Sequence, residues 1–407
     1  MKIFADCDPV STLRDLFRPR GAFSSVMPLT CAVLSLTMFC SRGTAQSASQ
    51  EMRTCRIESI EFEGWQARQL SNSRVKIVVV PKLGGRVMQV YFEDHPYLFV
   101  NAKYKGMYIS PEEAAKKDRW INYGGDKIWP LPEGSEDEHH WPGPISDLLD
   151  DGNYEFTIVS EAPNCKIRLD GPAEPKTGLQ YSREIALSSD SPEIHFHAVM
   201  RNIADHPIQW SMQSVTQFDT GDPRVPENYN RDFWAFAPAN PNSAYFGSYY
   251  VRDGLADDPS FRVGDGLFCL HWLPLENEVW LDSSAGWLAV VDGATDYAMI
   301  EKFHSVIGGD YPGKAMVIFY KNGSIIHLDE QGFPALLPAQ GENSARYMEA
   351  ELNSPLVSLA PGETYAMDTE WRPVRIKKSK ADANSIACTR LLRAIGNPEA
   401  PQGADPK

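Results

Sequence analysis

The segment EIHFHAVMRN, residues 193–202, indicates by its alternation which kind of fold the chain adopts. Ile194 and Phe196 are apolar, whereas His195 and His197 are polar and follow them one position later. Successive side chains of an extended strand point to opposite faces, so the apolar residues would cover one face and the histidines the other. Alternation of this kind predicts a β-strand with one buried face.

Segments rich in β-forming residues follow one another along most of the chain. Many of them alternate apolar and polar residues, and turn residues such as Asp-Gly, Asn-Gly and Pro-Gly separate them. They are residues 75–81, 86–92, 154–161, 165–171, 179–187, 208–218, 266–272, 286–293, 297–305, 315–323, 345–353 and 364–375. So many antiparallel strands predict an all-β sandwich or barrel. No repeat of fixed period stands out, which disfavours a propeller or a solenoid.

Helical periodicity is confined to residues 383–395 and to the shorter segment 110–117. We therefore expect one all-β domain over residues 55–376, preceded by a linker at 46–54. Residues 377–407 are expected to hold a short C-terminal helix and a disordered tail, because the last of them are polar and rich in proline and glycine.

The first 45 residues resemble an export signal. Basic residues between Arg14 and Arg20 precede an apolar core at residues 26–40, and Ala45 ends a small-residue stretch suited to cleavage. We therefore predict a signal peptide at residues 1–45 and an exported protein, either periplasmic or secreted. The alternatives are a lipoprotein signal and an N-terminal helix of the fold itself.

Composition and charge narrow the range of partners. The 407 residues are 43% hydrophobic and carry a formal net charge of −15. This balance predicts a globular protein and disfavours nucleic acid or an anionic membrane surface as partner. No run of eighteen apolar residues is present, so no membrane span is expected. We expect a monomer.

Seven cysteines are present, and four of them lie beyond the predicted signal, at positions 55, 165, 269 and 388. Their wide spacing includes no Cys-x-x-Cys pair, which makes a zinc site improbable. One or two disulfides are compatible with this spacing, and a bond between Cys55 and Cys388 would tie the two ends of the mature chain together. Four buried free thiols are the alternative.

The segment INYGGDKIWPLPEG, residues 121–134, combines flexible glycines, hydrogen-bonding side chains and a flat aromatic ring. Glycines allow a ligand to approach the backbone closely, amide and ammonium groups suit hydroxyls, and an indole suits the C–H face of a pyranose. The alternative is a packed turn in which the Trp lies in the core. The sugar-binding candidates are Asn122, Gly124, Gly125, Lys127, Trp129 and, beyond the segment, Trp141.

Three segments in order resemble the galactose mutarotase-like superfamily. VVVPKLGGRVMQVYFED (78–94) is similar to its opening hairpin, and LVSLAPGETYAMDTEWRP (356–373) to its closing strand pair. Residues 121–134 stand where that superfamily has a Gly-Gly loop, and they most resemble a bacterial family of unknown function with an Asn-Tyr-Gly-Gly-x-Lys-x-Trp-Pro pattern. The resemblance implies an antiparallel β-supersandwich, two large sheets packed face to face, with a sugar cleft on one face.

The resemblance also implies candidate catalytic residues. Mutarotases use a Glu base and a His acid, because opening a hemiacetal needs one group to accept a proton and another to donate one. Glu349 matches the base, and Glu351 lies two residues on, so both would share one strand face. The alternative is that both are solvated strand residues. Val215 or Thr216 stands where the acid His is expected, so the usual acid is missing.

Substitutes for the missing groups follow elsewhere in the sequence. Gln217 would bind a sugar hydroxyl, although an amide is no general acid near neutral pH. His139 and His140 follow three acidic residues, 136–138, that would raise a His pKa and favour a proton donor. A plain surface loop and a weak metal site are the alternatives for this cluster.

Three classes of function remain open: an unconventional sugar epimerase, a non-catalytic carbohydrate-binding protein, and a polysaccharide hydrolase or lyase that uses paired acidic residues. The partner expected in each case is a mono- or oligosaccharide, and neutral sugars suit the negative net charge best. His195 and His197 have a spacing compatible with metal ligation, although such pairs are more often ordinary strand residues. We expect no metal and no cofactor.

Overall fold

The computed structural model describes residues 54–376, except 118–119, 133–146, 329–330, 332–333 and 338–343. The described residues all belong to one compact unit, residues 46–407. The predicted signal peptide, the acidic loop with His139, His140 and Trp141, and the predicted C-terminal helix lie outside them. No helix in the described part of the chain is long and apolar enough to cross a membrane.

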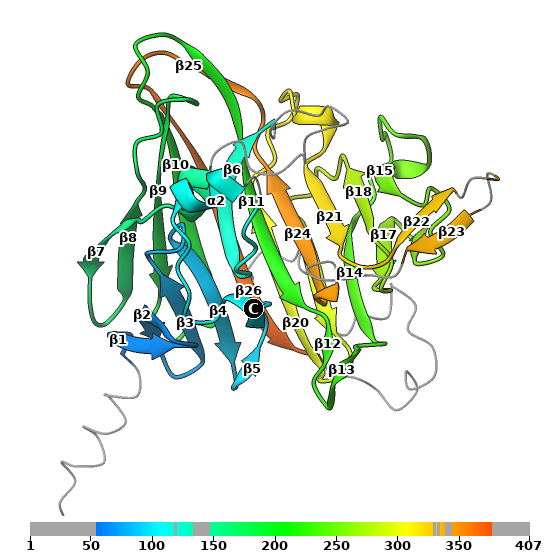
Figure 1. The fold of residues 1–407 in the computed structure, drawn as a ribbon, viewed down its shortest axis with the longest axis horizontal. Coiled ribbons are helices and arrows are strands. Elements are labelled where there is room, and N and C mark those ends of the chain that lie inside the picture. The colour runs from blue at the N-terminus through cyan, green and yellow to red at the C-terminus, as the bar shows by residue number, and fades with distance from the viewer. Residues whose placement is uncertain are drawn as a thin grey trace, which may run out of the picture. The chain divides into compact units, whose positions relative to one another are not determined.

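The larger of two main sheets is antiparallel and has 12 strands. In Figure 1 its neighbours β6, β11, β24, β21 and β18 follow one another from left to right. In spatial order the strands are β1 (Arg56–Phe62), β2 (Trp65–Ser71), β3 (Val75–Val80), β4 (Arg86–Phe92), β6 (Asp126–Leu131), β11 (Ile208–Asp219), β24 (Tyr347–Asn353), β21 (Val317–Lys321), β18 (Asn277–Leu281) and β15 (Tyr250–Gly254), while β5 (His95–Pro96) pairs with β4 and β25 (Val357–Leu359) with β11.

The second main sheet is also antiparallel and has 10 strands. In spatial order they are β16 (Phe261–Gly264), β17 (Leu267–His271), β14 (Phe233–Pro238), β19 (Trp287–Asp292), β20 (Tyr297–Phe303), β26 (Thr364–Arg375), β10 (Ile194–Asn202), β9 (Leu179–Leu187), β8 (Cys165–Asp170) and β7 (Glu155–Ser160). The remaining elements are short: β12 (Gly221–Asp222), β13 (Val225–Tyr229), β22 (Ile325–Leu328), β23 (Pro334–Leu337), α2 (Pro111–Lys117), α3 (Asp147–Asp151), η1 (Ala102–Tyr104), η2 (Phe246–Ser248) and η3 (Pro312–Lys314).

The two main sheets share one apolar core. Ile194 and Phe196 of β10 belong to it together with Met212 and Phe218 of β11 in the other sheet. His195, between the two apolar residues of β10, is exposed on the opposite face of its sheet. The predicted all-β fold, built from antiparallel sheets packed as a sandwich, is therefore confirmed.

The segment 126–131 is a strand and not the loop that its glycines and prolines suggested. As β6 it pairs with β11 from Asp126 to Leu131, and Pro130 lies within the paired segment. Ile128 packs in the core between the sheets, whereas Lys127 and Trp129 face the other way. The short run and its proline concealed an alternating strand whose polar residues are themselves buried.

A disulfide joins the edge of the larger sheet to the penultimate strand of the other. Cys55 precedes β1 and bonds with Cys165 at the start of β8, with their Cα atoms 5.5 Å apart. The backbone N–H of Cys55 also donates to the carbonyl oxygen of Pro163 at 3.0 Å. The considered bond between Cys55 and Cys388 is thus wrong, because widely spaced cysteines do not reveal their pairing. Cys269 also takes part in a disulfide.

Candidate functional site

The outer face of the larger sheet, turned away from the shared core, gathers the polar side chains of three neighbouring strands. On β24, Met348 and Leu352 face the core, so Glu349 and Glu351 project from the outer face. The cross-strand pairs on this face are Trp129 with Gln213, Lys127 with Val215, Val215 with Glu351, and Gln217 with Glu349. We call Lys127, Trp129, Gln213, Gln217, Glu349 and Glu351 the outer-face cluster.

Each carboxylate of the outer-face cluster is held by a glutamine from the adjacent strand. Gln217 Nε2 donates to Glu349 Oε1 at 2.5 Å, and Gln213 Nε2 donates to Glu351 Oε2 at 2.5 Å. The exposed fractions of Glu349 and Glu351 are only 8% and 6%. Burial raises the pKa of Glu349, and the hydrogen bond from Gln217 and the charge of Lys127 offset only part of that rise.

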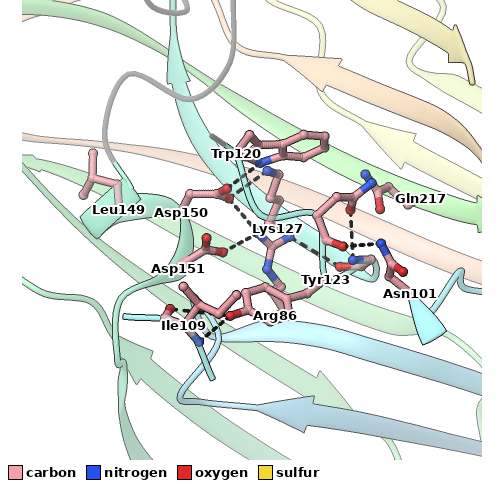
Figure 2. Close-up of polar contacts among 12 residues, drawn as sticks. Arg86, Asn101, Ile109, Trp120, Tyr123, Lys127, Leu149, Asp150, Asp151 and Gln217 are labelled. Carbon is pink, nitrogen blue, oxygen red and sulfur yellow. Dashed lines mark hydrogen bonds and ion pairs between the residues drawn. The ribbon is translucent and has the colours of Figure 1, made fainter. Parts of the chain in front are cut away.

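Lys127 is buried and lies against two indole rings. Its Nζ is 3.6 Å from the ring centroid of Trp129 and 4.8 Å from that of Trp120. The same Nζ forms an ion pair with Asp150 Oδ1 at 2.7 Å, as Figure 2 shows. Trp129 Nε1 in turn donates to Gln213, whose amide donates to Glu351, so the indole of Trp129 is linked to that carboxylate. Burial lowers the pKa of Lys127, and the charge of Asp150 partly restores it.

Lys127 belongs to a buried network of charged side chains. Arg86 Nη2 lies 2.9 Å from Asp150 Oδ1 and 2.8 Å from Asp151 Oδ1 (Figure 2). Burial would raise the pKa of Asp150, but Arg86 and Lys127 hold it below its ordinary value. Burial and the neighbouring charge of Asp150 raise the pKa of Asp151 to about 7. Two cations therefore face two carboxyl groups, and little net positive charge remains.

Sequence reasoning missed several of these residues. Asp150 and Asp151 belong to the five-residue helix α3, which shows no periodic pattern. Trp120 Nε1 donates to Asp150 Oδ2 at 3.0 Å, and the sequence gives no sign of that pairing. Gln213 was overlooked, although its position two residues before Val215 on the same strand face was a usable signal.

The two consecutive glycines of the segment 121–134 are needed for its backbone conformation. Gly124 and Gly125 have φ angles of 92° and 78°, in the region that favours glycine. A Cβ on Gly124 would lie 2.2 Å from the carbonyl oxygen of Phe99, so a side chain there would clash with the adjacent segment. Asn122 Oδ1 accepts from the Gly124 N–H at 3.0 Å, so this side chain holds the turn. These contacts favour the packed-turn alternative for the three residues.

The two candidate positions for the missing histidine lie on opposite faces. Val215 is on the outer face, where its cross-strand partners are Lys127 and Glu351. Thr216 faces the other sheet and donates to Asp126 Oδ2 at 3.1 Å. The outer-face cluster thus carries an apolar side chain where an imidazole was expected.

A hollow of about 640 Å³ has Asp219, at the end of β11, in its lining but none of the outer-face cluster. Its lining includes Phe99, whose ring stacks on Tyr347 with centroids 5.0 Å apart, and Tyr347 lies two residues before Glu349 on the same strand face. His95 also lines it, and burial lowers the pKa of His95 to about 4, opposed by Asp292. The lowered pKa disfavours the charged imidazolium form of His95 near neutral pH.

The fold resembles that of several solved structures. A putative mutarotase from Salmonella typhimurium matches with a TM-score of 0.51 and 7% identity, over 81% of this chain and 99% of that one. A TPR-domain containing protein from Parabacteroides distasonis matches with a TM-score of 0.50 and 13% identity, over 82% of this chain but only 51% of that one.

A galactose mutarotase-like protein from Clostridium acetobutylicum matches with a TM-score of 0.48 and 9% identity, over 80% of this chain and 100% of that one. No protein family model matches the sequence. Identities this low report on the fold, which the two packed antiparallel sheets described above share with the mutarotase structure. The chain therefore has the β-sandwich fold of galactose mutarotase-like proteins.

Proposed function

We propose that this protein binds carbohydrate at the outer-face cluster and processes it with Glu349 as the general base. The observation that carries the proposal is the gathering of Lys127, Trp129 and Glu349 on one sheet face, from strands far apart in the sequence. Amide, ammonium and carboxylate groups beside indole rings suit a ligand that has hydroxyl groups and an apolar C–H face.

The chemistry proposed is the opening and reclosing of a sugar hemiacetal. Glu349 accepts the proton of the anomeric hydroxyl, and an acid donates a proton to the ring oxygen as the ring opens; closure on the other face returns both protons. A raised pKa makes Glu349 a stronger base than an ordinary carboxylate. Because Val215 replaces the expected acid, Glu351 takes the acid role in this proposal. Turnover should rise with pH as Glu349 becomes ionised and fall again once the acid Glu351 has lost its proton.

The balance of charge favours neutral sugars. Lys127 of the outer-face cluster and the neighbouring Arg86 are both paired with Asp150. An anionic sugar would therefore meet little uncompensated positive charge, and the net charge of −15 would repel it at long range. The ligand class that fits best is a neutral mono- or oligosaccharide.

Export is part of the same proposal. The bond between Cys55 and Cys165 and the second disulfide at Cys269 support an oxidising compartment, such as the periplasm or the cell exterior. Measuring the location of the full-length protein in fractionated cells tests this point. Recovery from the cytoplasm with reduced thiols would contradict it.

A non-catalytic carbohydrate-binding protein is the second candidate. Val215 favours this candidate, because an apolar side chain at the expected position of the acid cannot donate the proton that ring opening needs. In that case the indole of Trp129 contributes more than the carboxylate of Glu349. The two candidates therefore differ in which substitution is damaging.

The test begins with a panel of mono- and oligosaccharides read by thermal shift, because a ligand of the native state raises the melting temperature. Polarimetry on freshly dissolved α-glucose and α-galactose then measures epimerisation. Under the catalytic proposal, Glu349→Gln lowers turnover by about 10²–10⁴-fold and changes affinity little. Glu184→Gln, on the outer face of the other sheet, is the matched control and should leave both unchanged.

The same experiment separates the alternatives. Binding without turnover, lost in Trp129→Ala and kept in Glu349→Gln, would support the non-catalytic candidate. Absence of a thermal shift with every sugar of a broad panel would count against both.

A further inference from the structure

We propose a divalent transition-metal site formed by Glu193, His195 and Glu370 on the outer face of the 10-stranded sheet. His195 of β10 and Glu370 of β26 are direct cross-strand partners, so their side chains leave the sheet side by side. Glu193 lies immediately before β10 and two residues before His195. The three side chains belong to neither the outer-face cluster nor the hollow lined by His95.

The three ligand atoms lie close enough to converge on one ion. One imidazole nitrogen and one oxygen from each carboxylate all lie within 4.8 Å of one another. His195 Nδ1 is 3.6 Å from Glu370 Oε2, which is too long for a good hydrogen bond. Two ligands bound tetrahedrally to one zinc ion are about 3.4 Å apart, given bonds of about 2.1 Å. This pair therefore needs almost no movement to bind a shared ion.

Neighbouring groups orient both carboxylates. Lys302 Nζ lies 3.0 Å from Glu370 Oε1, which leaves Oε2 directed at His195. Ser191 Oγ donates to Glu193 Oε2 at 3.3 Å and accepts from the Glu193 N–H at 3.1 Å. Such outer contacts fix the ligands of protein metal sites and tune their affinity. The positive charge of Lys302 offsets one carboxylate, which predicts moderate affinity.

An ion at this site would stay accessible to solvent. The side chain of His195 is 49% exposed and that of Glu370 is 25% exposed. Three protein ligands leave coordination positions for water, as in other open zinc sites. His197 is held by its own partner, because its Nδ1 lies 2.7 Å from Asp368 Oδ1. The proposed ligand set therefore excludes His197.

The donor set selects the class of metal. An imidazole with carboxylates suits zinc and its transition-metal neighbours, whereas Mg²⁺ and Ca²⁺ prefer sites made of oxygen alone. A bound ion would join β10 to β26 and to the chain just before β10, so it would stabilise the native state. We assign it no part in the sugar chemistry, since its ligands lie on the sheet that does not carry Glu349.

The experiment is isothermal titration of the EDTA-treated full-length protein with Zn²⁺, and with Mg²⁺ for comparison. We expect one zinc ion per chain, weak or absent Mg²⁺ binding, and a higher melting temperature with Zn²⁺. His195→Gln and Glu370→Gln should each weaken zinc binding by at least about tenfold. The visible spectrum of the Co²⁺-substituted protein gives a second readout of coordination.

Two variants serve as controls. His206→Gln removes an exposed histidine beside Asp205 in a loop, and it should leave the zinc affinity unchanged. His197→Gln should also leave it unchanged. An equal loss of affinity in His197→Gln and His195→Gln would refute this ligand set, and unaltered zinc binding in His195→Gln would refute the site. Because these side chains are on the surface, the variants should fold.

Discussion

The consecutive residues Asp150 and Asp151 show how strongly a buried site controls single side chains. Both are fully buried and both contact Arg86, yet the pKa of Asp150 falls while that of Asp151 rises. The difference arises because Asp150 also contacts Lys127 and Trp120. Asp150 is thus the anion that holds the network together, and Asp151 exchanges its proton near neutral pH.

Substitution of these two residues by Asn should therefore give unequal results. Asp150→Asn leaves two buried cations without their shared partner and should lower the free energy of unfolding by about 3–5 kcal/mol. Asp151→Asn should lower the free energy of unfolding much less at pH 7. The folded pKa of Asp151 lies above the ordinary 3.8, so its stabilisation is complete below that pH and is lost as the pH rises to about 7. Asp151→Asn should flatten this decline in urea unfolding series between pH 4 and 8; equal losses in the two variants would contradict the assignment.

Glu301 makes a second prediction at this scale. It lies buried between the sheets near Asp126 and Arg183, and burial followed by the charge of Asp126 raises its pKa well above the ordinary value. Stability from its neutral form is present below about pH 4.5 and is lost as the pH rises. Glu301→Gln keeps the shape without the ionisation.

We expect Glu301→Gln to raise the free energy of unfolding at pH 8, because the amide removes the ionisation that burial opposes. The gain should shrink toward pH 4. Denaturant unfolding at both pH values measures it, and Glu184→Gln on the surface provides the control. A loss of stability at both pH values would show that the Glu301 carboxylate is needed.

At the scale of elements, the disulfide between Cys55 and Cys165 holds the beginning of β1 to the beginning of β8 across 110 residues. A bond that closes so long a loop restricts the unfolded chain strongly. The double variant Cys55→Ala/Cys165→Ala should lose about 2–4 kcal/mol of unfolding free energy. Guanidinium unfolding measures the loss, and the variant should respond less than the wild type to added reductant. An unchanged unfolding midpoint would mean that β1 and β8 keep their positions without the disulfide.

Sequence patterns predicted the elements better than the contacts between them. Residues 179–187 and 364–375 were expected as strands and form β9 and β26 with the same bounds, because their alternation is long and regular. β6 was missed, since a six-residue strand that contains Pro130 and follows two glycines resembles a turn. Glu349 and Glu351 were expected on one face, and β24 is regular enough to place them there.

The supporting charges of the candidate site were beyond prediction. Asp150 reaches Lys127 because α3 is placed beside β6 by the tertiary fold, and no local pattern in residues 147–151 encodes that placement. Asn122, a sugar-binding candidate from the sequence, accepts a hydrogen bond from the Gly124 N–H in a turn with two positive φ angles, which only the tertiary structure displays. Long-range pairing of buried charges depends on three-dimensional contacts that a single sequence does not display.

At the scale of the whole molecule, one core joins the two main sheets. Leu281 and Val317 of the larger sheet share it with Phe268 and Trp371 of the other. Neither sheet buries its inner face alone, so the sheets should unfold together. We predict that far-UV circular dichroism and tryptophan fluorescence give the same urea midpoint. Two separate midpoints would show that one sheet persists without the other.

The indoles of Trp120 and Trp129 have a further consequence. Their ring centroids are 6.5 Å apart and their planes are inclined at 50°, with the Lys127 ammonium against both. Two indoles this close and obliquely oriented couple their strong electronic transitions, which produces a paired band in far-ultraviolet circular dichroism. Any ligand that binds against either indole, or displaces Lys127, would alter that band. The protein thus carries its own label-free optical reporter, which the Trp120→Phe variant would silence.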